Sequence, residues 1–489
     1  RARLALAIAL PALAALAACG GGDAARPPPP PLAEPLRVTG ASPYPPGCNP
    51  PVGAVRLWLG AEVEPHLAVD PADPDHLVAA WQQDRWDGGG ANGTGAAASF
   101  DGGRTWTRRD PAFSACAGGG AGAWARTSDP WVAIGADGTV HVMALAFDDP
   151  WDGARSAMVA SRSTDGGRTW SARATLAQED VRDQALDKNT LTADPGRPGF
   201  AYAVWDRLEG LTGPAAEARG PAYLARTRDG GLGWEGPWVL HDPGADAQTI
   251  SSQVVVLPDG ALVNVLVLIR RSSTAAPEVE VAVLRSVDAE ADPAAGPSWS
   301  GPFTVAAWNS LGIVDPQGGR PVRGGDVVPA IAVDRSGGPR RGWLYVAWQH
   351  AFGGVDGVAV SRSEDGGLTW TAPARASAAA VPAFTPALAV DGTGQVGLAY
   401  YDWRPPPPGS APGLWTTRWL ATSADGGGTW SERPSGGPFD LRRAPAVPGW
   451  FLGDYAGLVG GPAGFTSLFA MPAADGSDPA DLFVDPAQP

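Results

Sequence analysis

A short cluster built on Asp–Gly–Gly recurs along the chain and constrains the fold more than any other feature. Clear copies are SFDGGRTW (99–106), STDGGRTW (163–170), TRDGGLGW (227–234), SEDGGLTW (363–370) and SADGGGTW (423–430). A degraded copy lies in the longest gap, where Ser286-Val-Asp288 is separated by an insertion from Ser298-Trp299. A roughly constant period indicates a repeat architecture, in which each copy marks one supersecondary unit.

Each repeat contains short β-prone segments and no stretch with helical periodicity. In the first repeat, HLAV (66–69) and HLVAAW (76–81) flank the turn DPADPD, and AAASF (96–100) precedes the cluster and TWTRR (105–109). Four such segments separated by turn residues predict four antiparallel strands. We therefore expect an all-β fold, a β-propeller of four-stranded antiparallel blades.

The Asp–Gly–Gly cluster is predicted to form the hairpin between the third and fourth strands of each blade. Glycine permits positive φ in a tight turn, and the aspartate can accept its unpaired N–H groups. The tryptophan can then pack between neighbouring sheets. This structural role is expected for Asp101, Trp106, Asp165, Trp170, Asp229, Trp234, Asp365, Trp370, Asp425 and Trp430.

The number of blades is left at two alternatives. First strands are predicted to start near Pro65, Pro130, Asn189, Ser252, Val328 and Pro386, which makes six complete units. The segments 451–460, 464–471 and 481–486 resemble three further strands, and LRVTGAS (36–42) could supply a fourth. We favour seven blades. In the six-blade alternative, the C-terminal tail packs against the propeller as an additional segment and is not a blade.

The N-terminus has the pattern of an export signal. Arg1 and Arg3 precede an apolar run from Leu4 to Ala18, which is short for a membrane span. Its last residues, Leu16-Ala17-Ala18-Cys19, resemble the lipobox of bacterial lipoproteins. The resemblance implies a signal peptide (1–18), lipidation of Cys19 and anchoring to a membrane, facing the periplasm or cell surface. A Pro/Gly-rich tether (19–36) and a single propeller domain (37–489) are expected to follow.

Composition excludes some partners and predicts one cross-link. The net charge of −15 repels nucleic acid, and no basic patch is visible in the sequence. Cys48 and Cys116 can pair in an exported protein. The five histidines lack zinc-ligand spacing, so no cofactor is predicted. We expect a monomer.

Strand direction places the Asp–Gly–Gly turns on the face opposite the starts of first strands and the ends of second strands. Those starts and ends are rich in charge, whereas the strand interiors are apolar. Such a rim around a central channel favours a binding or catalytic role, the alternative being solvated charges and ion pairs. The rim carries Glu64, Asp84, Arg85, Asp129, Asp187, Lys188, Asp206, Arg207, Asp326, Asp402, Arg404 and Asp454.

The pattern S-x-D-x-G-x-T-W resembles the Asp box of sialidases and related BNR-repeat propellers. That family holds its substrate carboxylate with three arginines and uses a tyrosine nucleophile, a partner glutamate and an aspartic acid. The resemblance implies substrate-binding arginines among Arg85, Arg207 and Arg404. It implies catalytic residues among Tyr401, Tyr455, Glu64, Asp84 and Asp402. Other expected substrate-binding residues are Asp129, Asp187, Lys188, Asp206, Asp326 and Asp454.

The chain also departs from the family. No Arg-Ile-Pro triplet precedes the first copy, and Glu64-Pro65-His66 stands there instead. The acidic rim could equally serve a paired-carboxylate glycosidase acting on neutral sugars, or hold a divalent cation through oxygen ligands. Two functions remain: a cell-surface, exo-acting glycoside hydrolase of sialidase type, and a non-catalytic propeller that binds glycan or protein partners.

Overall fold

The computed structural model describes residues 34–51, 53–120, 122–148, 155–211, 219–271, 276–406 and 408–486. The predicted signal peptide (1–18), Cys19 and the tether up to residue 33 lie outside these ranges. The described residues from Glu34 onward form one compact unit by their internal contacts. Over the described ranges, no helix is long and apolar enough to cross a membrane.

The first sheet has eight strands and consists of two four-stranded halves. Its halves are joined by one residue pair, Ala91 with Thr127. The first half comprises β2 (Leu57–Val69), β3 (Leu77–Trp86), β4 (Ala91–Ser99) and β5 (Thr107–Arg108). The second half comprises β6 (Arg126–Ile134), β7 (Val140–Phe147), β8 (Ser156–Ser163) and β9 (Ala174–Glu179).

Four separate antiparallel sheets follow, each with its strands in chain order. The first of them comprises β10 (Gln184–Ala193), β11 (Ala201–Glu209), β12 (Ala222–Thr227) and β13 (Glu235–His241), and the second comprises β14 (Ala247–Val256), β15 (Leu262–Arg270), β16 (Glu278–Ser286) and β17 (Ser300–Ala307). The third comprises β20 (Ala330–Val333), β21 (Leu344–Phe352), β22 (Val355–Ser363) and β23 (Ala374–Arg375). The fourth comprises β24 (Ala383–Val390), β25 (Val396–Asp402), β26 (Trp415–Ser423) and β27 (Ser431–Asp440).

The closing sheet joins the two ends of the described chain. It contains β30 (Gly457–Gly460), β31 (Phe465–Met471), β32 (Asp481–Asp485) and β1 (Leu36–Arg37). β1 pairs antiparallel with β32, so that Leu36 lies opposite Val484. Leu36, which the sequence analysis assigned to the tether, is therefore part of this sheet.

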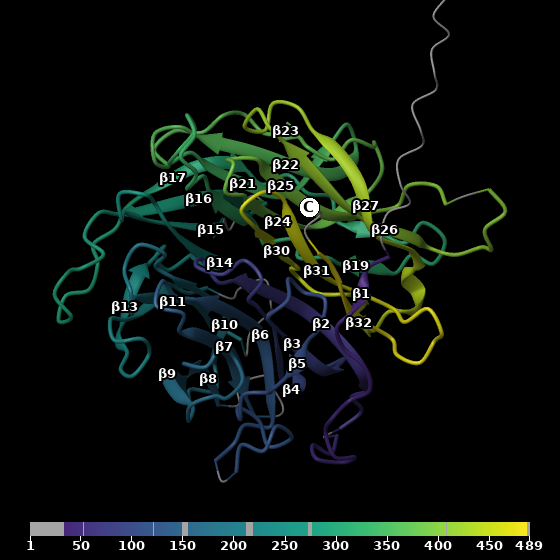
Figure 1. Ribbon diagram of the computed structural model, residues 1–489, viewed down its shortest axis with the longest axis horizontal. Helices are drawn as coiled ribbons and strands as arrows, with labels where there is room; N and C mark the ends of the chain where they lie inside the picture. Colours follow the sequence, from purple (N-terminus) through teal and green to yellow (C-terminus); the bar gives the residue numbers. More distant parts are fainter. Residues whose placement is uncertain are drawn as a thin grey trace, which may run out of the picture. The chain divides into compact units, whose positions relative to one another are not determined.

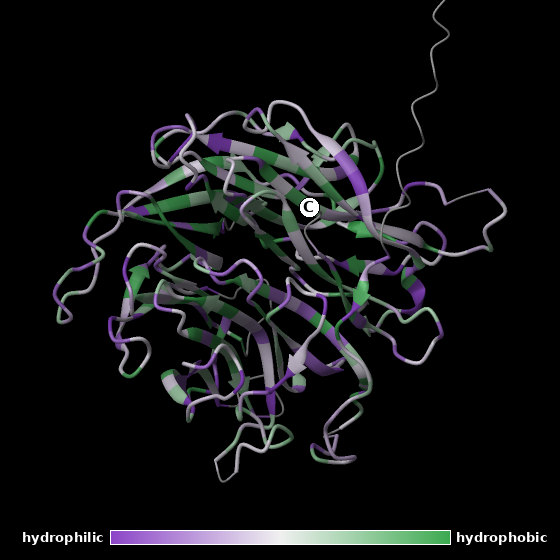
Figure 2. Cartoon of the chain, viewed as in Figure 1, coloured by the Kyte–Doolittle hydropathy of each residue, from purple (hydrophilic) through white to green (hydrophobic). Residues whose placement is uncertain are grey.

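The first strands of these sheets follow one another in a closed order. β2 contacts β6, which contacts β10, and the series continues through β14, β20, β24 and β30 back to β2. Figure 1 shows fourth strands such as β9, β13, β17, β23 and β27 towards the outside of the view. Apolar residues fill the space between the two halves of the first sheet, where Val78 and Ala80 of β3 cluster with Val142 and Ala144 of β7. Hydrophobic residues accordingly follow the strands in Figure 2.

Each Asp–Gly–Gly cluster lies between the third and fourth strands of its unit. In the first copy, the Asp101 carboxylate accepts bonds from the backbone N–H groups of Arg104 and Thr105 at 3.0 and 2.9 Å, and from the Thr105 hydroxyl at 2.6 Å. These bonds lower the Asp101 pKa to about 2. The degraded copy keeps the pattern across its insertion, because Ser298 donates its N–H and hydroxyl to Asp288 at 2.9 and 2.6 Å.

Most first strands begin earlier than the sequence analysis predicted. β6 begins at Arg126 rather than near Pro130, and β24 at Ala383 rather than near Pro386. Each carries a bulge, since the pairing register shifts between Ser128 and Trp131 and between Phe384 and Ala387. A bulge inserts a residue and breaks the alternation of buried and exposed side chains. The periodicity visible in the sequence therefore starts only after the bulge.

A small additional sheet was not expected from the sequence. It joins two linkers far apart in the chain through β18 (Ile313–Val314), β19 (Pro321–Arg323), β28 (Ala446–Val447) and β29 (Gly449–Phe451). β19 and β29 pair in parallel, and the 3-10 helix η2 (Leu441–Arg443) supplies Arg442, which binds the Asp315 carboxylate at 2.9 Å through both Nε and a terminal nitrogen. The linkers are therefore held together.

A disulfide joins the N-terminal segment to the first sheet. Cys48 and Cys116 are bonded, and they lie 68 positions apart in the sequence. The link ties the segment before β2 to the loop that leads into β6.

Candidate functional site

Backbone strain is concentrated at one position of the first strands. Five non-glycine residues at their bulges have positive φ: Glu64 (53°), Asp129 (48°), Lys188 (49°), Ser251 (64°) and Thr385 (50°). A residue in the left-handed region costs about 1–3 kcal/mol, and such residues cluster at functional sites. The repeated strain therefore points to the end of the first strands nearest these bulges.

Charged side chains from several sheets meet at this end. Lys188 places its Nζ 2.6 Å from Asp454 Oδ2 and 3.5 Å from Asp129 Oδ1. Arg323 binds the same Asp454 carboxylate with two nitrogens, at 3.0 and 2.7 Å. Burial alone would raise the pKa of Asp454, but the positive charges of Arg323 and Lys188 have the larger effect and hold that pKa well below the ordinary value. Asp454 is thus an ionised anchor for two cations.

Two other carboxyl groups here hold protons more tightly than usual. Glu64 is completely buried and accepts a hydrogen bond from the Gln82 amide. Burial, together with the charges of Asp129 and Asp454, raises the pKa of Glu64 to about 8. Burial also raises the pKa of Asp187 to about 6, although the adjacent Lys188 opposes the rise. The site therefore combines ionised and protonated carboxyl groups near neutral pH.

Arg85 is a buried cation with unused hydrogen-bonding capacity. It is 2% exposed and donates to Gln82 Oε1 at 2.7 Å, whereas its Nε finds no partner among the described residues. Burial, and then the nearby Arg323 charge, lower the pKa of Arg85 to about 10. Both guanidinium groups lie over the ring of buried Phe451, at 5.1 Å for Arg85 and 4.7 Å for Arg323. Such contacts stabilise cations that are partly removed from water.

These groups surround a pocket of about 370 Å³. It is bounded by the glycine turn at 88–90 and by the small sheet that carries Arg323. Its volume lies in the range of small-ligand sites. The lining residues are Arg85, Asp87, Gly88, Gly89, Gly90, Ser128, Asp129, Leu145, Phe147, Asp187, Lys188, Arg323 and Pro448.

Several residues expected at the rim are placed in or beside this pocket. Arg85, Asp129, Asp187 and Lys188 line it directly. Asp454 is joined to Lys188, and the Asp454 N–H lies 3.4 Å from Glu64 Oε1. Most of these groups are buried rather than solvated, and they form ion pairs, which the alternative prediction also named.

Tyr455 lies beside the pocket rather than in its wall. Its hydroxyl is buried and donates to the Pro130 carbonyl at 3.0 Å. Burial, followed by the charge of Glu64, raises the pKa of Tyr455 well above its ordinary value. A buried, protonated hydroxyl bonded to a carbonyl is poorly suited to act as a nucleophile.

The three arginines named as a candidate carboxylate-binding trio are not gathered in this pocket. Arg207 instead pairs with Glu209 at 2.6 Å on its own strand. Arg404 pairs with Asp402 at 2.7 Å and with Glu432, and stacks 3.6 Å from the centre of the Trp419 ring. Asp402 is thus used in an ion pair within its own sheet.

Two further candidates, Tyr401 and Asp84, are buried and bonded to residues outside the pocket. Tyr401 is 1% exposed and donates to the Ala470 carbonyl at 2.8 Å, and burial raises its pKa to about 12. Asp84 is fully buried on the opposite face of β3 from Arg85 and accepts bonds from the Ser42 hydroxyl at 2.6 Å and the Gly60 N–H at 3.0 Å. It therefore anchors the segment before β2.

Asp206 and Asp326 also lie outside the pocket lining. Asp206 is fully buried, and burial raises its pKa to about 7. Burial, followed by the charge of Asp454, raises the pKa of Asp326 to about 6. Within the described ranges, no group of three or more His, Cys, Asp or Glu residues is arranged to hold a metal ion.

Sequence reasoning missed Arg323, Phe451 and Gln82 as members of one site. Arg323 lies in a linker outside the repeated segments. Phe451 was predicted to begin the strand at 451–460, but it ends β29, and β30 begins only at Gly457. The two residues meet because β19 pairs with β29. No local pattern marks that pairing. Gln82 lies in β3, and its alignment with Glu64 depends on the bulge in β2.

The chain matches no family model and no curated protein. Similar solved structures include the Hadza microbial sialidase Hz136 (15% identity, 84% of this chain and 76% of that chain, TM-score 0.47). Another is a Penicillium chrysogenum alpha-L-arabinanase complexed with arabinobiose (16% identity, 75% and 93% coverage, TM-score 0.46). A third is Trypanosoma rangeli sialidase (13% identity, 78% and 55% coverage, TM-score 0.43). Because these similarities are weak, the fold and the function are inferred from the strands and side chains of this chain.

Proposed function

We propose that the chain is a seven-bladed β-propeller of the Asp-box kind and an exo-acting glycoside hydrolase resembling sialidases. The two halves of the first sheet, the four following sheets and the closing sheet supply seven four-stranded blades. The closed order of first-strand contacts supports this ring. One observation supports the activity: Asp129 and Asp187 share a small pocket with Arg85, Lys188 and Arg323. Two of these residues, Asp129 and Lys188, lie on strained backbone.

The proposed chemistry uses two carboxyl groups of one pocket in different roles. Asp187, with a pKa of about 6, is the proton donor to the leaving oxygen. Asp129, whose Oδ1 lies 3.5 Å from the Lys188 ammonium, acts as nucleophile or base. Glycoside hydrolysis ordinarily requires such a pair. No tyrosine lines the pocket in the described residues, so paired carboxylates suit this geometry better than a tyrosine nucleophile.

The cations give the pocket a preference for oxygen-rich groups. Arg85 lines the pocket, and its guanidinium adds positive charge to the wall. Arg323 and Lys188 are already paired with Asp454, so they add positive potential and define the wall. Glycan hydroxyl or acidic groups are therefore the proposed ligands.

Release of a fluorophore from a panel of 4-methylumbelliferyl glycosides tests the proposal. The panel includes an α-sialoside, a uronide and neutral arabinosides and hexosides. Asp187→Asn and Asp129→Asn are each expected to lower kcat by about 10²-fold or more. Asp246→Asn, a change at an exposed position, is the matched control. Absence of turnover on the whole panel, or unchanged rates in both pocket variants, would refute the hydrolase.

A second candidate is a non-catalytic propeller that binds glycan or protein partners. It is favoured by the extensive pairing of Arg323, Lys188 and Asp454, which would hold the blades together without chemistry. This candidate predicts saturable binding of a glycan or a protein partner, with no product released over long incubation. Binding without turnover therefore selects it over the hydrolase.

We also propose that the protein is a monomeric bacterial lipoprotein anchored through Cys19. The support is the sequence pattern ending in Leu16-Ala17-Ala18-Cys19. Labelling of expressing cells with a palmitate analogue is expected to mark the protein, and Cys19→Ala to abolish the label. A labelled Cys19→Ala variant would contradict the anchor, and light scattering of the delipidated protein measures its oligomeric state.

A further inference from the structure

Two polar groups of the candidate pocket take no part in the proposed chemistry, the Ser128 hydroxyl and the Asp87 carboxylate. Both residues are partly exposed, whereas Arg85 and Asp129 in the same wall are each 2% exposed. A ligand in the pocket can therefore reach Ser128 and Asp87 directly. A small number of such polar groups ordinarily fixes the orientation of a small ligand and provides specificity.

The Ser128 hydroxyl is oriented to donate a hydrogen bond. Arg85 donates to Gln82 Oε1 at 2.7 Å, and because a guanidinium group can only donate, this bond fixes the orientation of the Gln82 amide. The amide nitrogen then donates to the Glu64 carboxyl group and to Ser128 Oγ, the latter at 3.1 Å. Since Ser128 Oγ accepts this bond, its own proton is available for another acceptor, and among the described residues none accepts it.

Asp87 offers the opposite kind of group, an acceptor. Its Oδ1 accepts a bond from the Arg56 N–H at 2.9 Å, and its own N–H donates to the Arg56 carbonyl at 3.0 Å, so the residue is held in place. No described residue donates to its Oδ2. The neighbouring glycine turn leaves room for a ligand, because a Cβ at Gly89 would meet no atom within 4 Å. The Asp87 carboxylate can therefore accept a bond from a ligand hydroxyl.

The charges of the pocket disfavour an acidic sugar. Three of its lining residues are cations and three carry carboxyl groups: Arg85, Lys188, Arg323, Asp87, Asp129 and Asp187. The two partly exposed cations, Lys188 and Arg323, are already bonded to Asp454 at 2.6 and 2.7 Å. A ligand carboxylate would have to compete with Asp454 for them and would lie near Asp87 and Asp187. A sugar hydroxyl both donates and accepts, so it suits either kind of group.

We infer that Ser128 and Asp87 determine the specificity of the pocket and that its ligand is a neutral glycosyl unit rather than an acidic one. The inference rests on the proposed function, because it takes this pocket as the sugar site. Ser128 donates to a ring or hydroxyl oxygen of the sugar. Asp87 accepts from one of the sugar hydroxyl groups and repels a sugar that carries a carboxylate.

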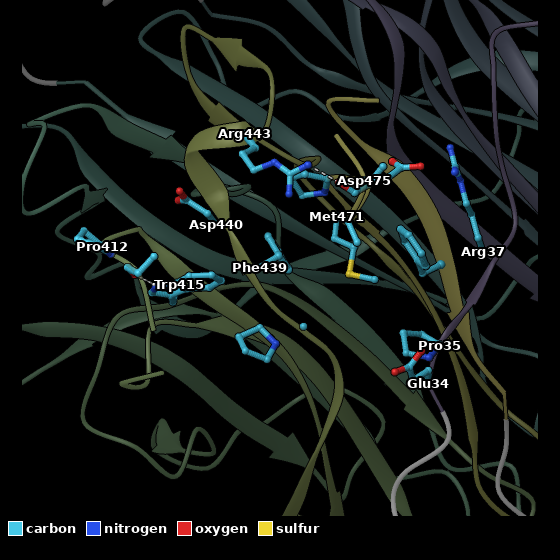
Figure 3. Close-up of a pocket in the computed structure, with 17 residues that line it drawn as sticks. Glu34, Pro35, Arg37, Pro412, Trp415, Phe439, Asp440, Arg443, Met471 and Asp475 are labelled. Carbon is cyan, nitrogen blue, oxygen red and sulfur yellow. Dashed lines mark hydrogen bonds between the residues drawn. The ribbon is translucent and has the colours of Figure 1, made fainter. Parts of the chain in front are cut away.

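A second cavity, of about 770 Å³, provides a control site. Its lining includes residues of β26, β27, β31 and β32, and it shares no lining residue with the candidate pocket. Figure 3 shows this lining, which includes the exposed Asp475. Like Asp87, Asp475 has one carboxylate oxygen bonded to a backbone N–H, that of Ser477 at 2.9 Å. Asp475→Asn is therefore the matched control for Asp87→Asn.

Titration of the whole protein with free sugars, followed by saturation-transfer NMR, tests the inference separately from turnover. The probes are glucose, galactose and L-arabinose, with glucuronate, galacturonate and N-acetylneuraminate as the acidic sugars. At least one neutral sugar is expected to bind about tenfold more tightly than the acidic sugars. Ser128→Ala is expected to weaken its binding about two- to tenfold, and Ser128→Thr, which keeps a hydroxyl, to restore most of it. Asp87→Asn should reduce the preference for the neutral sugar about fivefold.

The same variants are compared in the hydrolysis of a fluorogenic glycoside. Ser128→Ala should raise KM by a similar factor and change kcat less, because the bond to the sugar is already made in the ground state. Asp475→Asn should bind and hydrolyse as the parent does.

Three results would overturn the inference and leave the hydrolase proposal standing: tighter binding of an acidic sugar, an unchanged affinity in Ser128→Ala, or an unchanged preference in Asp87→Asn. An equal loss of binding in Asp475→Asn would place the sugar in the second cavity and overturn it too. If no glycoside is hydrolysed but a neutral sugar binds through Ser128, the hydrolase fails and the inferred specificity stands. Absence of both binding and turnover refutes both.

Discussion

Replacing Ser251 by glycine should stabilise the protein. Ser251 has φ of 64°, is 2% exposed, and its hydroxyl is buried without a hydrogen-bond partner among the described residues. A left-handed conformation costs a non-glycine residue about 1–2 kcal/mol. An unsatisfied buried hydroxyl costs about 1–3 kcal/mol more. Glycine removes both penalties, and its greater freedom in the unfolded chain offsets about 0.5–1 kcal/mol of the gain.

The expected net gain in the free energy of unfolding is about 1–4.5 kcal/mol, combining the strain, hydroxyl and chain-entropy contributions. Unfolding entropy scales with chain length, so for this domain each kcal/mol raises Tm by about 1 °C. Differential scanning calorimetry should therefore show a Tm increase of about 1–4 °C in Ser251→Gly.

Ser251→Ala separates the two sources of the gain. Alanine removes the unpaired hydroxyl but keeps a side chain in the left-handed region, so it should recover only the hydroxyl part. Ser251→Gly should therefore be more stable than Ser251→Ala. If the alanine variant equals or exceeds the glycine variant, the bulge of β14 is not strained, and the argument from repeated positive φ fails.

Three other perturbations test separate parts of the structure. Removing the disulfide with Cys48→Ala and Cys116→Ala should cost about 4 kcal/mol, because it frees a loop of 68 residues, measured by urea unfolding. Asp454→Asn should cost about 3–5 kcal/mol, because it leaves buried cations without their carboxylate, measured in the same assay. The raised folded-state pKa of Glu64, about 8 against an ordinary 4.5, means that the folded protein binds this proton more tightly. Its contribution to stability is complete below about pH 4.5 and is lost as pH rises through about 8, so Glu64→Gln should flatten the decline over that window.

Each of these results has a contrary outcome. Equal urea midpoints with and without the two cysteines would show that the disulfide does not restrain the unfolded chain. An Asp454→Asn protein as stable as the parent would mean that Lys188 and Arg323 need no partner. An unaltered pH profile in Glu64→Gln would place the titration of stability in another group.

The hairpins and strands could be predicted from the sequence because each depends on residues that are close together in the chain. An Asp–Gly–Gly turn needs only residues within about one hairpin, and its acceptor pattern survives even the insertion between Asp288 and Ser298. The alternation of apolar residues likewise predicts strands wherever no bulge intervenes. The same reasoning located the charged ends of first strands, including Asp129, Lys188 and Asp454.

The sequence could not show which of these charged residues line the candidate pocket, because that depends on neighbours from other sheets. Arg85 and Arg404 look alike in the sequence, but Arg404 meets Asp402 and Glu432, whereas Arg85 keeps a free Nε beside a pocket. Tyr401 was an attractive candidate until the structure placed its hydroxyl against a backbone carbonyl in the core.

The repeat, the β-strands and the separation of turn face from charged face were therefore determined by sequence alone, since each rests on spacing along one hairpin. The tertiary structure decided which charges share a site. It brought Arg323 and Phe451 together through a parallel pairing between distant linkers, and it set Lys188 of β10 against Asp454 ahead of β30. Burial and charge then determine the protonation of Glu64 and Asp187, and both arise only when separate sheets pack around a common centre.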